Sequence, residues 1–323
     1  MGRRVALALG SGGARGYAHI GVINELRNRG YEIVGVAGSS MGALVGGLCA
    51  AGSLDEFTHW SRTLTQRAML RLLDPSISAA GVFRAGKILD AVRDIVGDAT
   101  IESLPIPFTA VTTDLIAGKS VWLQRGPLDE AIRASIAIPG VIAPHVIDGR
   151  MLADGGILDP LPIAPIAAVN ADITIAVSVS GTEADVGDQL GSDVRPTRER
   201  LNRLLRSTSA LLDKFSTIPE APPGAADAEI EAFELAEIEA AEQAESQFPK
   251  LGSFAVMMRS IDIAQAALAR HQMAAYPPDL LIEVPRTACR SLDFHRAAEV
   301  IDLGHQLAAR ALDGLEERRS DSL

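Results

Sequence analysis

The pattern of apolar and polar positions at the start of the chain predicts a β-α-β unit. The run Val5–Leu9 is continuously apolar, which is typical of a buried strand. A helix is expected from about Tyr17 to Arg29, with apolar residues near helical spacing and Gly30 as its stop. The next apolar run, Ile33–Ala37, predicts a second strand. A strand, a helix and a strand in this order imply parallel strands joined by a helical crossover.

Strand and helix signals continue to alternate along the chain, which favours an α/β fold with a mainly parallel central sheet. We expect helices at Ala43–Ala51, Asp55–Leu73, Ala85–Val96, Leu128–Ser135, Phe254–Ala275 and Phe294–Leu315. We expect further strands at Phe108–Thr113, Ser120–Leu123, Asp172–Val179 and Asp279–Val284. A hairpin is predicted at His145–Ala153, because Asp148-Gly149 is typical of a two-residue turn. In the predicted helix Asp55–Leu73, apolar residues that include Phe57, Trp60 and Leu64 would either pack in the core or line an acyl pocket.

The segment Thr182–Lys250 departs from this pattern. Its first part has an apolar stripe at helical spacing, decorated by Arg195, Arg198, Arg200, Arg203 and Arg206. Between Glu220 and Glu245 there are nine acidic residues and no Lys or Arg. A basic helix followed by an acidic one predicts a helical hairpin that serves as a lid or as a surface touching lipid. The alternative is a packed or partly disordered insertion.

These patterns divide the chain into a single domain, 1–323, with a core of about 5–181 and 251–315. An insertion occupies 182–250, and 316–323 is expected to be a frayed tail. The net charge of −11 argues against a nucleic-acid partner. The two cysteines, Cys49 and Cys289, are expected to be buried free thiols in a reducing compartment. No window of 18 apolar, uncharged residues occurs, so we expect a cytoplasmic protein, soluble or peripheral to the inner membrane.

The first candidate for chemistry is the turn Gly38-Ser39-Ser40-Met41-Gly42, which lies between a predicted strand and a predicted helix. Strand, sharp turn and helix are the context of a nucleophile elbow, in which Ser40 would be exposed on a strained turn. Gly38 and Gly42 would be required because a Cβ at either position would meet the neighbouring strand or helix. Ser40 would then lie at a helix N-terminus, where free amides favour negative charge. The alternative is a Gly/Ser-rich loop that only caps a helix.

A second candidate is the loop Gly10–Gly16, which follows the first strand. A dinucleotide-binding fingerprint fails there, because Arg15 stands where the third glycine is needed and no acidic residue ends the second strand. A Walker loop also fails, because no Gly-Lys-Ser/Thr follows. What remains is a loop of backbone amides suited to an anionic oxygen, or a tight turn into a helix.

A serine nucleophile needs a general base. An ordinary α/β-hydrolase triad is improbable, because only 39 residues precede Ser40 and that fold needs several strands before its elbow. The six histidines are His19, His59, His145, His271, His295 and His305. His19, His271, His295 and His305 fall in predicted helices, where a surface or packing role is expected. A local role for His145 stays open, and none of the six is placed to face Ser40. Asp154 is the stronger candidate for the base, because it ends a predicted strand and is followed by Gly155 and Gly156, which would leave the carboxylate uncrowded. Burial would raise its pKa and make it more basic; the alternative is a simple Asp-Gly-Gly turn.

Three features stand in order: the loop Gly10–Gly16, the elbow around Ser40, and Asp154-Gly155-Gly156. The set resembles the patatin-like phospholipases, in particular their bacterial acylesterase branch. Arg133-Ala134-Ser135 with Pro139-Gly140 is similar to the middle of that family, and Thr182–Lys250 is not. The resemblance implies a three-layer α/β/α fold and a Ser-Asp dyad, with Ser40 as nucleophile and Asp154 as base. It also implies an oxyanion hole from the amides of Gly12, Gly13, Ala14, Arg15 and Gly16, in a loop whose glycine run is interrupted by Ser11.

The expected activity is hydrolysis of a lipid acyl ester, of the phospholipase A, lysophospholipase or carboxylesterase type. The substrate would be a phospholipid, a lysophospholipid or another acyl ester, and no metal or organic cofactor is required. Two alternatives are a catalytically silent lipid-binding module that acts through the insertion, and a transacylase. Peripheral membrane contact and a homo-oligomer both stay open at this stage.

Overall fold

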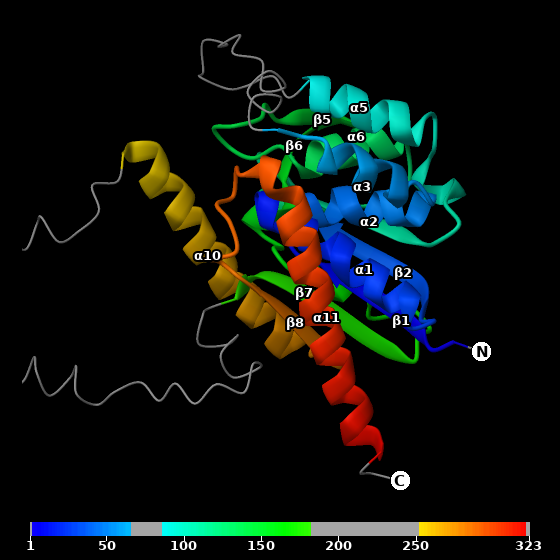
Figure 1. Ribbon diagram of the computed structural model, residues 1–323. Helices are drawn as coiled ribbons and strands as arrows, with labels where there is room; N and C mark the ends of the chain where they lie inside the picture. Colours follow the sequence, from blue (N-terminus) through cyan, green and yellow to red (C-terminus); the bar gives the residue numbers. More distant parts are fainter. Residues whose placement is uncertain (1, 66–85, 182–251, 321–323) are drawn as a thin grey trace, which may run out of the picture. The chain divides into compact units, whose positions relative to one another are not determined.

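The computed structural model describes residues 2–65, 86–181 and 252–320 (Figure 1). The chain divides into two compact units, Met1–Gly191 with Arg259–Leu323, and Ser192–Met258. The second unit and the predicted helical hairpin lie almost entirely outside the described residues. The division into one domain, an insertion and a tail therefore stays a prediction.

An eight-stranded mixed sheet forms the centre of the first unit. Its strands are β1 (Arg4–Leu9), β2 (Glu32–Ser39), β3 (Phe108–Asp114), β4 (Lys119–Leu123), β5 (His145–Ile147), β6 (Arg150–Asp154), β7 (Ile173–Gly181) and β8 (Leu280–Pro285). They run in the order β5-β6-β3-β2-β1-β7-β8, and β4 pairs with β3. Five neighbouring strands of this sheet pair in parallel, namely β3, β2, β1, β7 and β8. The pairs β3–β4, β3–β6 and β5–β6 are antiparallel. The predicted mainly parallel sheet is confirmed.

Helices cover both faces of this sheet (Figure 1). They are α1 (Ala18–Asn28), α2 (Met41–Ala51), α3 (Leu54–Arg62), α5 (Gly86–Val96), α6 (Leu128–Ser135), α10 (Ser253–Ala275) and α11 (Ala297–Ser320). Short 3-10 turns include η1 (Gly13–Tyr17) and η5 (Phe294–Arg296). α11 continues to Ser320, beyond the predicted end at Leu315, so part of the expected frayed tail is helical.

Helix α3 is shorter than the predicted helix Asp55–Leu73. It ends at Arg62, and the part of the prediction after Thr65 lies outside the described residues. The Thr63 hydroxyl donates a hydrogen bond to the Trp60 carbonyl at 2.7 Å, and the Leu64 amide bonds Ser61, three residues back. A threonine hydroxyl competes in this way with the regular helical ladder, which the apolar spacing alone does not reveal.

Side chains on the two faces of β1 pack into two different hydrophobic cores. Val5, Leu7 and Leu9 are fully buried in the large core beneath α1, α2 and α11. Ala6 and Ala8 point to the other face, in a smaller core that includes Ala269 of α10. Successive strand residues face opposite sides, so a continuously apolar strand implies a sheet covered on both faces. The three-layer α/β/α arrangement is confirmed.

Strand β3 aligns the ends of two other strands along one of its edges. Antiparallel β4 occupies one edge of β3 from Ala110 to Asp114. On the other edge, β2 pairs through Ser39 opposite Val111, and β6 pairs through Asp154 opposite Thr112. Because Val111 and Thr112 are consecutive, the carboxyl ends of β2 and β6 meet at one point of the sheet.

Helices α1 and α11 touch backbone to backbone, and α11 runs alongside α1 in Figure 1. A Cβ added at Gly21 would collide with the Ile301 carbonyl oxygen, and one added at Gly304 would collide with the Ala18 carbonyl oxygen. Neither obstacle is a flexible side chain that could move aside. The two glycines therefore permit the close approach that holds α11 against the rest of the fold.

We predict that Gly304→Ala destabilises the protein, although alanine is the better helix former. The collision with α1 should cost about 1–3 kcal/mol, measured as a fall in the free energy of unfolding in urea. Gly314→Ala is the matched control in the same helix, because its Cβ would meet only the Arg318 guanidinium at 3.7 Å. That variant should be neutral or up to about 1 kcal/mol more stable. Equal effects of the two substitutions would contradict the close contact.

Candidate active site

Ser40 lies on a strained turn between β2 and α2. Its backbone angles are φ 55° and ψ −122°, a conformation that non-glycine residues rarely adopt. A Cβ at Gly38 would collide with the Gly42 carbonyl, and one at Gly42 would collide with the Leu9 carbonyl. The sharp turn thus depends on both glycines, as expected of a nucleophile elbow.

The strained turn is held by a hydrogen bond from another part of the chain. The Ser40 amide donates to Ser135 Oγ at 2.9 Å, and Ser135 Oγ donates to the Val111 carbonyl at 2.6 Å. Ser135 ends α6, and Val111 lies in β3. The elbow is therefore tied through Ser135 to the strand that also aligns β6.

The Ser40 hydroxyl donates a hydrogen bond to Asp154 Oδ2 at 2.5 Å. The other carboxylate oxygen, Oδ1, accepts from the Gly156 amide at 2.7 Å, and the Ser11 side chain also hydrogen-bonds the carboxyl group. Asp154 is 3% exposed. Burial raises the pKa of Asp154 to about 6, although these three hydrogen bonds act to lower it. The carboxyl group is thus a stronger base than an exposed aspartate and still mostly ionised at pH 7.

Histidines do not take part in this pair among the described residues. His19 is fully buried, and its Nε2 donates to the Gly10 carbonyl at 2.8 Å. Burial lowers the pKa of His19 to about 4, so the ring is neutral at pH 7 and supports the glycine-rich loop. His145, for which a local role was open, contacts Glu130, and His305 contacts Glu25.

Some backbone amides of the glycine-rich loop donate hydrogen bonds within the fold, and others do not. The Ser11 amide donates to the Pro160 carbonyl, and the Ala14 amide donates to the Ser291 carbonyl, both at 2.8 Å. Within the described part of the chain, the amides of Gly12 and Gly13 make no hydrogen bond. Of the predicted donors, Ala14 is therefore committed to the fold, and Gly12 and Gly13 are the amides available to an anionic oxygen.

Arg15 anchors this loop through its side chain. Arg15 is 4% exposed, and its guanidinium pairs with Asp262 of α10 and with Ser291 Oγ, both at 3.0 Å. Its Nε also donates to the Gly12 carbonyl at 3.3 Å. Gly16 is packed against Met41, since a Cβ there would collide with that side chain. Arg15 and Gly16 thus shape the loop.

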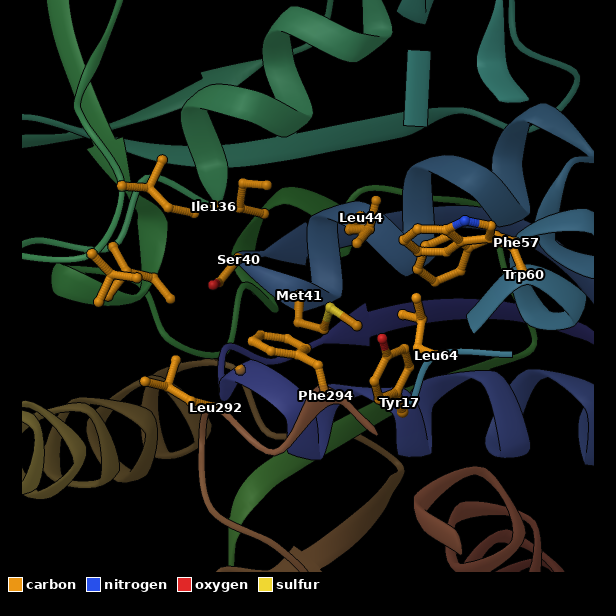
Figure 2. A pocket seen from close by; sticks show the side chains of 14 residues that line it. Tyr17, Ser40, Met41, Leu44, Phe57, Trp60, Leu64, Ile136, Leu292 and Phe294 are labelled. Atoms are coloured by element: carbon orange, nitrogen blue, oxygen red, sulfur yellow. The ribbon is translucent and has the colours of Figure 1, made fainter. Parts of the chain in front are cut away.

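A largely apolar pocket opens beside Ser40 (Figure 2). Gly13 and Ser40 both line it, so the glycine-rich loop and the elbow border the same space. The aromatic part of the lining consists of Tyr17, Phe57, Trp60 and Phe294. Aliphatic residues complete it, among them Leu44, Leu64 and Ile136. Phe57, Trp60 and Leu64 all line this pocket, and Phe57 and Trp60 also pack in the large hydrophobic core, so the structure supports both predicted roles. A hydrocarbon chain is the group that such a surface accommodates.

The structure adds two polar residues to the predicted site. Ser11, which interrupts the glycine run, hydrogen-bonds the Asp154 carboxyl group, and Ser135 holds the elbow. The Arg133-Ala134-Ser135 motif before Pro139-Gly140 drew attention to the region of Ser135, and no local signal gave either residue its role. No cluster of three or more His, Cys, Asp or Glu side chains suited to a metal ion occurs in residues 2–65, 86–181 and 252–320. None of the described helices is long and apolar enough to cross a membrane.

The amino-acid sequence matches the family model described as patatin-like phospholipase over residues 7–167, a range that contains both Ser40 and Asp154. An uncharacterized NTE family protein of Mycobacterium tuberculosis is 65% identical over 334 residues, covering 97% of this chain and 92% of that protein. Neuropathy target esterase sws of Drosophila melanogaster is 33% identical over 200 residues, which are 60% of this chain and 14% of that protein. Lysophospholipase nte1 of Emericella nidulans is 31% identical over 231 residues, which are 68% of this chain and 14% of that protein. The chain therefore belongs to the patatin-like phospholipase family.

Proposed function

We propose that this protein is a serine lipid acyl hydrolase in which Ser40 and Asp154 form the catalytic dyad. The observation that carries the proposal is the 2.5 Å hydrogen bond from the Ser40 hydroxyl directly to the Asp154 carboxylate. A nucleophile within hydrogen-bond reach of its base is the arrangement that acyl transfer requires. Membership of the patatin-like phospholipase family supports a lipid ester as the substrate.

In the first step, Ser40 Oγ attacks the carbonyl carbon of the ester, and its proton passes to Asp154 Oδ2. The carbonyl oxygen becomes an oxyanion, which the amides of Gly12 and Gly13 stabilise by hydrogen bonds. The tetrahedral intermediate then collapses, the bond to the leaving alcohol breaks, and that alcohol takes the proton from Asp154. The product of this half-reaction is an acyl group on Ser40.

In the second step, water attacks the acyl-enzyme, and Asp154 accepts the proton from that water. A second oxyanion forms in the same place and collapses to release the carboxylic acid and the Ser40 hydroxyl, which regains its proton from Asp154. Because Asp154 is buried, its raised pKa of about 6 lies close enough to neutrality for it to take and return a proton.

The pocket beside Ser40 favours an acyl chain over a small polar acyl group. Its aromatic and aliphatic lining would exclude water from the chain and strengthen the electrostatic interactions around Ser40. A relative that matches over 68% of this chain is named a lysophospholipase. We infer that the substrate is a lipid acyl ester of the phospholipid, lysophospholipid or carboxylic ester type.

We infer a reducing compartment, such as the cytoplasm, as the place of the reaction. Cys49 and Cys289 are both free and buried, as predicted, and unpaired thiols are typical of intracellular proteins. The substrate itself is a lipid, so we expect peripheral contact with a membrane surface during turnover.

Replacing either member of the dyad should abolish most hydrolysis. Ser40→Ala and Asp154→Asn should each lower kcat/KM for a p-nitrophenyl acyl ester by on the order of 10⁴-fold, because nucleophile and base act as a unit. Ser39→Ala is the matched control, since Ser39 is buried beside Ser40 and its hydroxyl has no hydrogen-bond partner in the described residues. Hydrolysis near the wild-type rate in either dyad variant would show that the assignment is wrong.

The rate should also depend on the protonation of Asp154. Because its pKa is raised to about 6, kcat/KM should be constant above that pH and fall about tenfold per pH unit below it. Burial also raises the pKa of Asp159 to about 6, and Gln272 hydrogen-bonds that carboxylate at 2.7 Å. Asp159→Asn is therefore the control for the assignment. This variant should keep the fall in kcat/KM below about pH 6. If the fall disappears in Asp159→Asn, it reports the protonation of Asp159 and not of Asp154.

A further inference from the structure

Tyr17 places a polar group in the wall of the apolar pocket. The residue lies in η1, directly after the glycine-rich loop, and is 2% exposed. Figure 2 shows its hydroxyl pointing into the space between Met41 and Leu64. The ring stacks with Phe57 at a centroid distance of 6.4 Å and meets Phe294 edge-on at 6.2 Å. These two aromatic contacts hold the direction of the hydroxyl.

The Tyr17 hydroxyl has no hydrogen-bond partner among the residues that the structure describes. Burial raises the pKa of Tyr17 well above its ordinary value, so the group is a protonated hydroxyl that can donate or accept. A buried tyrosine hydroxyl usually finds a partner, because an unpaired one loses the hydrogen bonds that water would provide. The hydroxyl is therefore available to a ligand in the pocket.

The apolar lining of the pocket offers a water molecule few polar partners. The pocket that Tyr17 shares with Met41, Leu44, Leu64 and Phe294 is lined there by apolar side chains (Figure 2). A buried water needs two or more polar partners, and these side chains offer none. A plain hydrocarbon chain would cover the hydroxyl and leave it equally unpaired. A chain that carries an oxygen atom at this depth would pair with it.

We propose that Tyr17 is a specificity-determining residue whose hydroxyl binds an oxygen atom on the acyl chain, so that the preferred substrates are esters of hydroxylated or keto acids. This inference deepens the proposed hydrolase function and rests on it. A site that hydrogen-bonds a substrate oxygen discriminates against the analogue that lacks it, because the buried group of the protein is then left unpaired.

The test is a series of p-nitrophenyl esters of equal chain length, one plain and the others with a hydroxyl group moved carbon by carbon along the chain. In the wild type, the hydroxyl at one position should raise kcat/KM roughly tenfold over the plain chain. Tyr17→Phe should lose that preference, and its kcat/KM for the plain ester should rise because the unpaired hydroxyl is gone. Tyr31→Phe is the matched control, since Tyr31 is also buried but does not line the pocket.

The outcomes separate this inference from the function on which it rests. If Ser40-dependent hydrolysis occurs and no hydroxyl position is preferred, or if Tyr17→Phe keeps the preference, the inference is overturned and the hydrolase proposal stands. If no ester in the series is cleaved in a Ser40-dependent way, both fail. A preference that Tyr31→Phe also removes would be a general effect on the fold and would overturn the role of Tyr17.

Discussion

The site depends on one constraint in the sheet, the meeting of β2 and β6 along the same edge of β3. Ser39 lies opposite Val111 and Asp154 lies opposite Thr112, so neighbouring residues of one strand fix the ends of two others. Ser40 follows Ser39 directly and reaches Asp154 in a single hydrogen bond. The serine and its carboxylate lie 114 positions apart in the sequence, yet they require no flexible loop to meet. A site built on strand ends is held more precisely than one built on loops.

The same arrangement explains how a carboxylate can be buried and remain useful. An uncompensated buried charge is costly, but here three donors share it: Ser40, the Gly156 amide and Ser11. Burial still dominates and raises the pKa of Asp154 to about 6. The strained backbone of Ser40 is stabilised in turn by Ser135, which is bonded to β3. Strain and desolvation thus occur where the chemistry is proposed, and the surrounding sheet and helices compensate for both.

Features that depend on a few neighbouring residues could be predicted from the sequence. The apolar run Val5–Leu9 indicated a strand covered on both faces, and Asp148-Gly149 indicated a hairpin whose two turn residues do have positive φ. The glycines around Ser40 indicated a sharp turn for a steric reason that the structure bears out. Contacts between residues far apart in the sequence could not be predicted in this way, because no short stretch of sequence specifies both partners. Ser135 meets Ser40 across 95 positions, the Ala14 amide is taken by Ser291, and Thr63 ends α3 within a continuing apolar pattern.

Covalent labelling tests most directly whether Ser40 is a nucleophile that Asp154 activates. The protein would be treated with a fluorophosphonate, and the site and rate of labelling followed by mass spectrometry. We expect a single label on Ser40, formed faster as the pH rises through about 6, and formed far more slowly in Asp154→Asn. An unreactive Ser40, as a silent lipid-binding module would have, would show that Ser40 is not an activated nucleophile. An equal labelling rate in wild type and Asp154→Asn would show that Asp154 does not activate it.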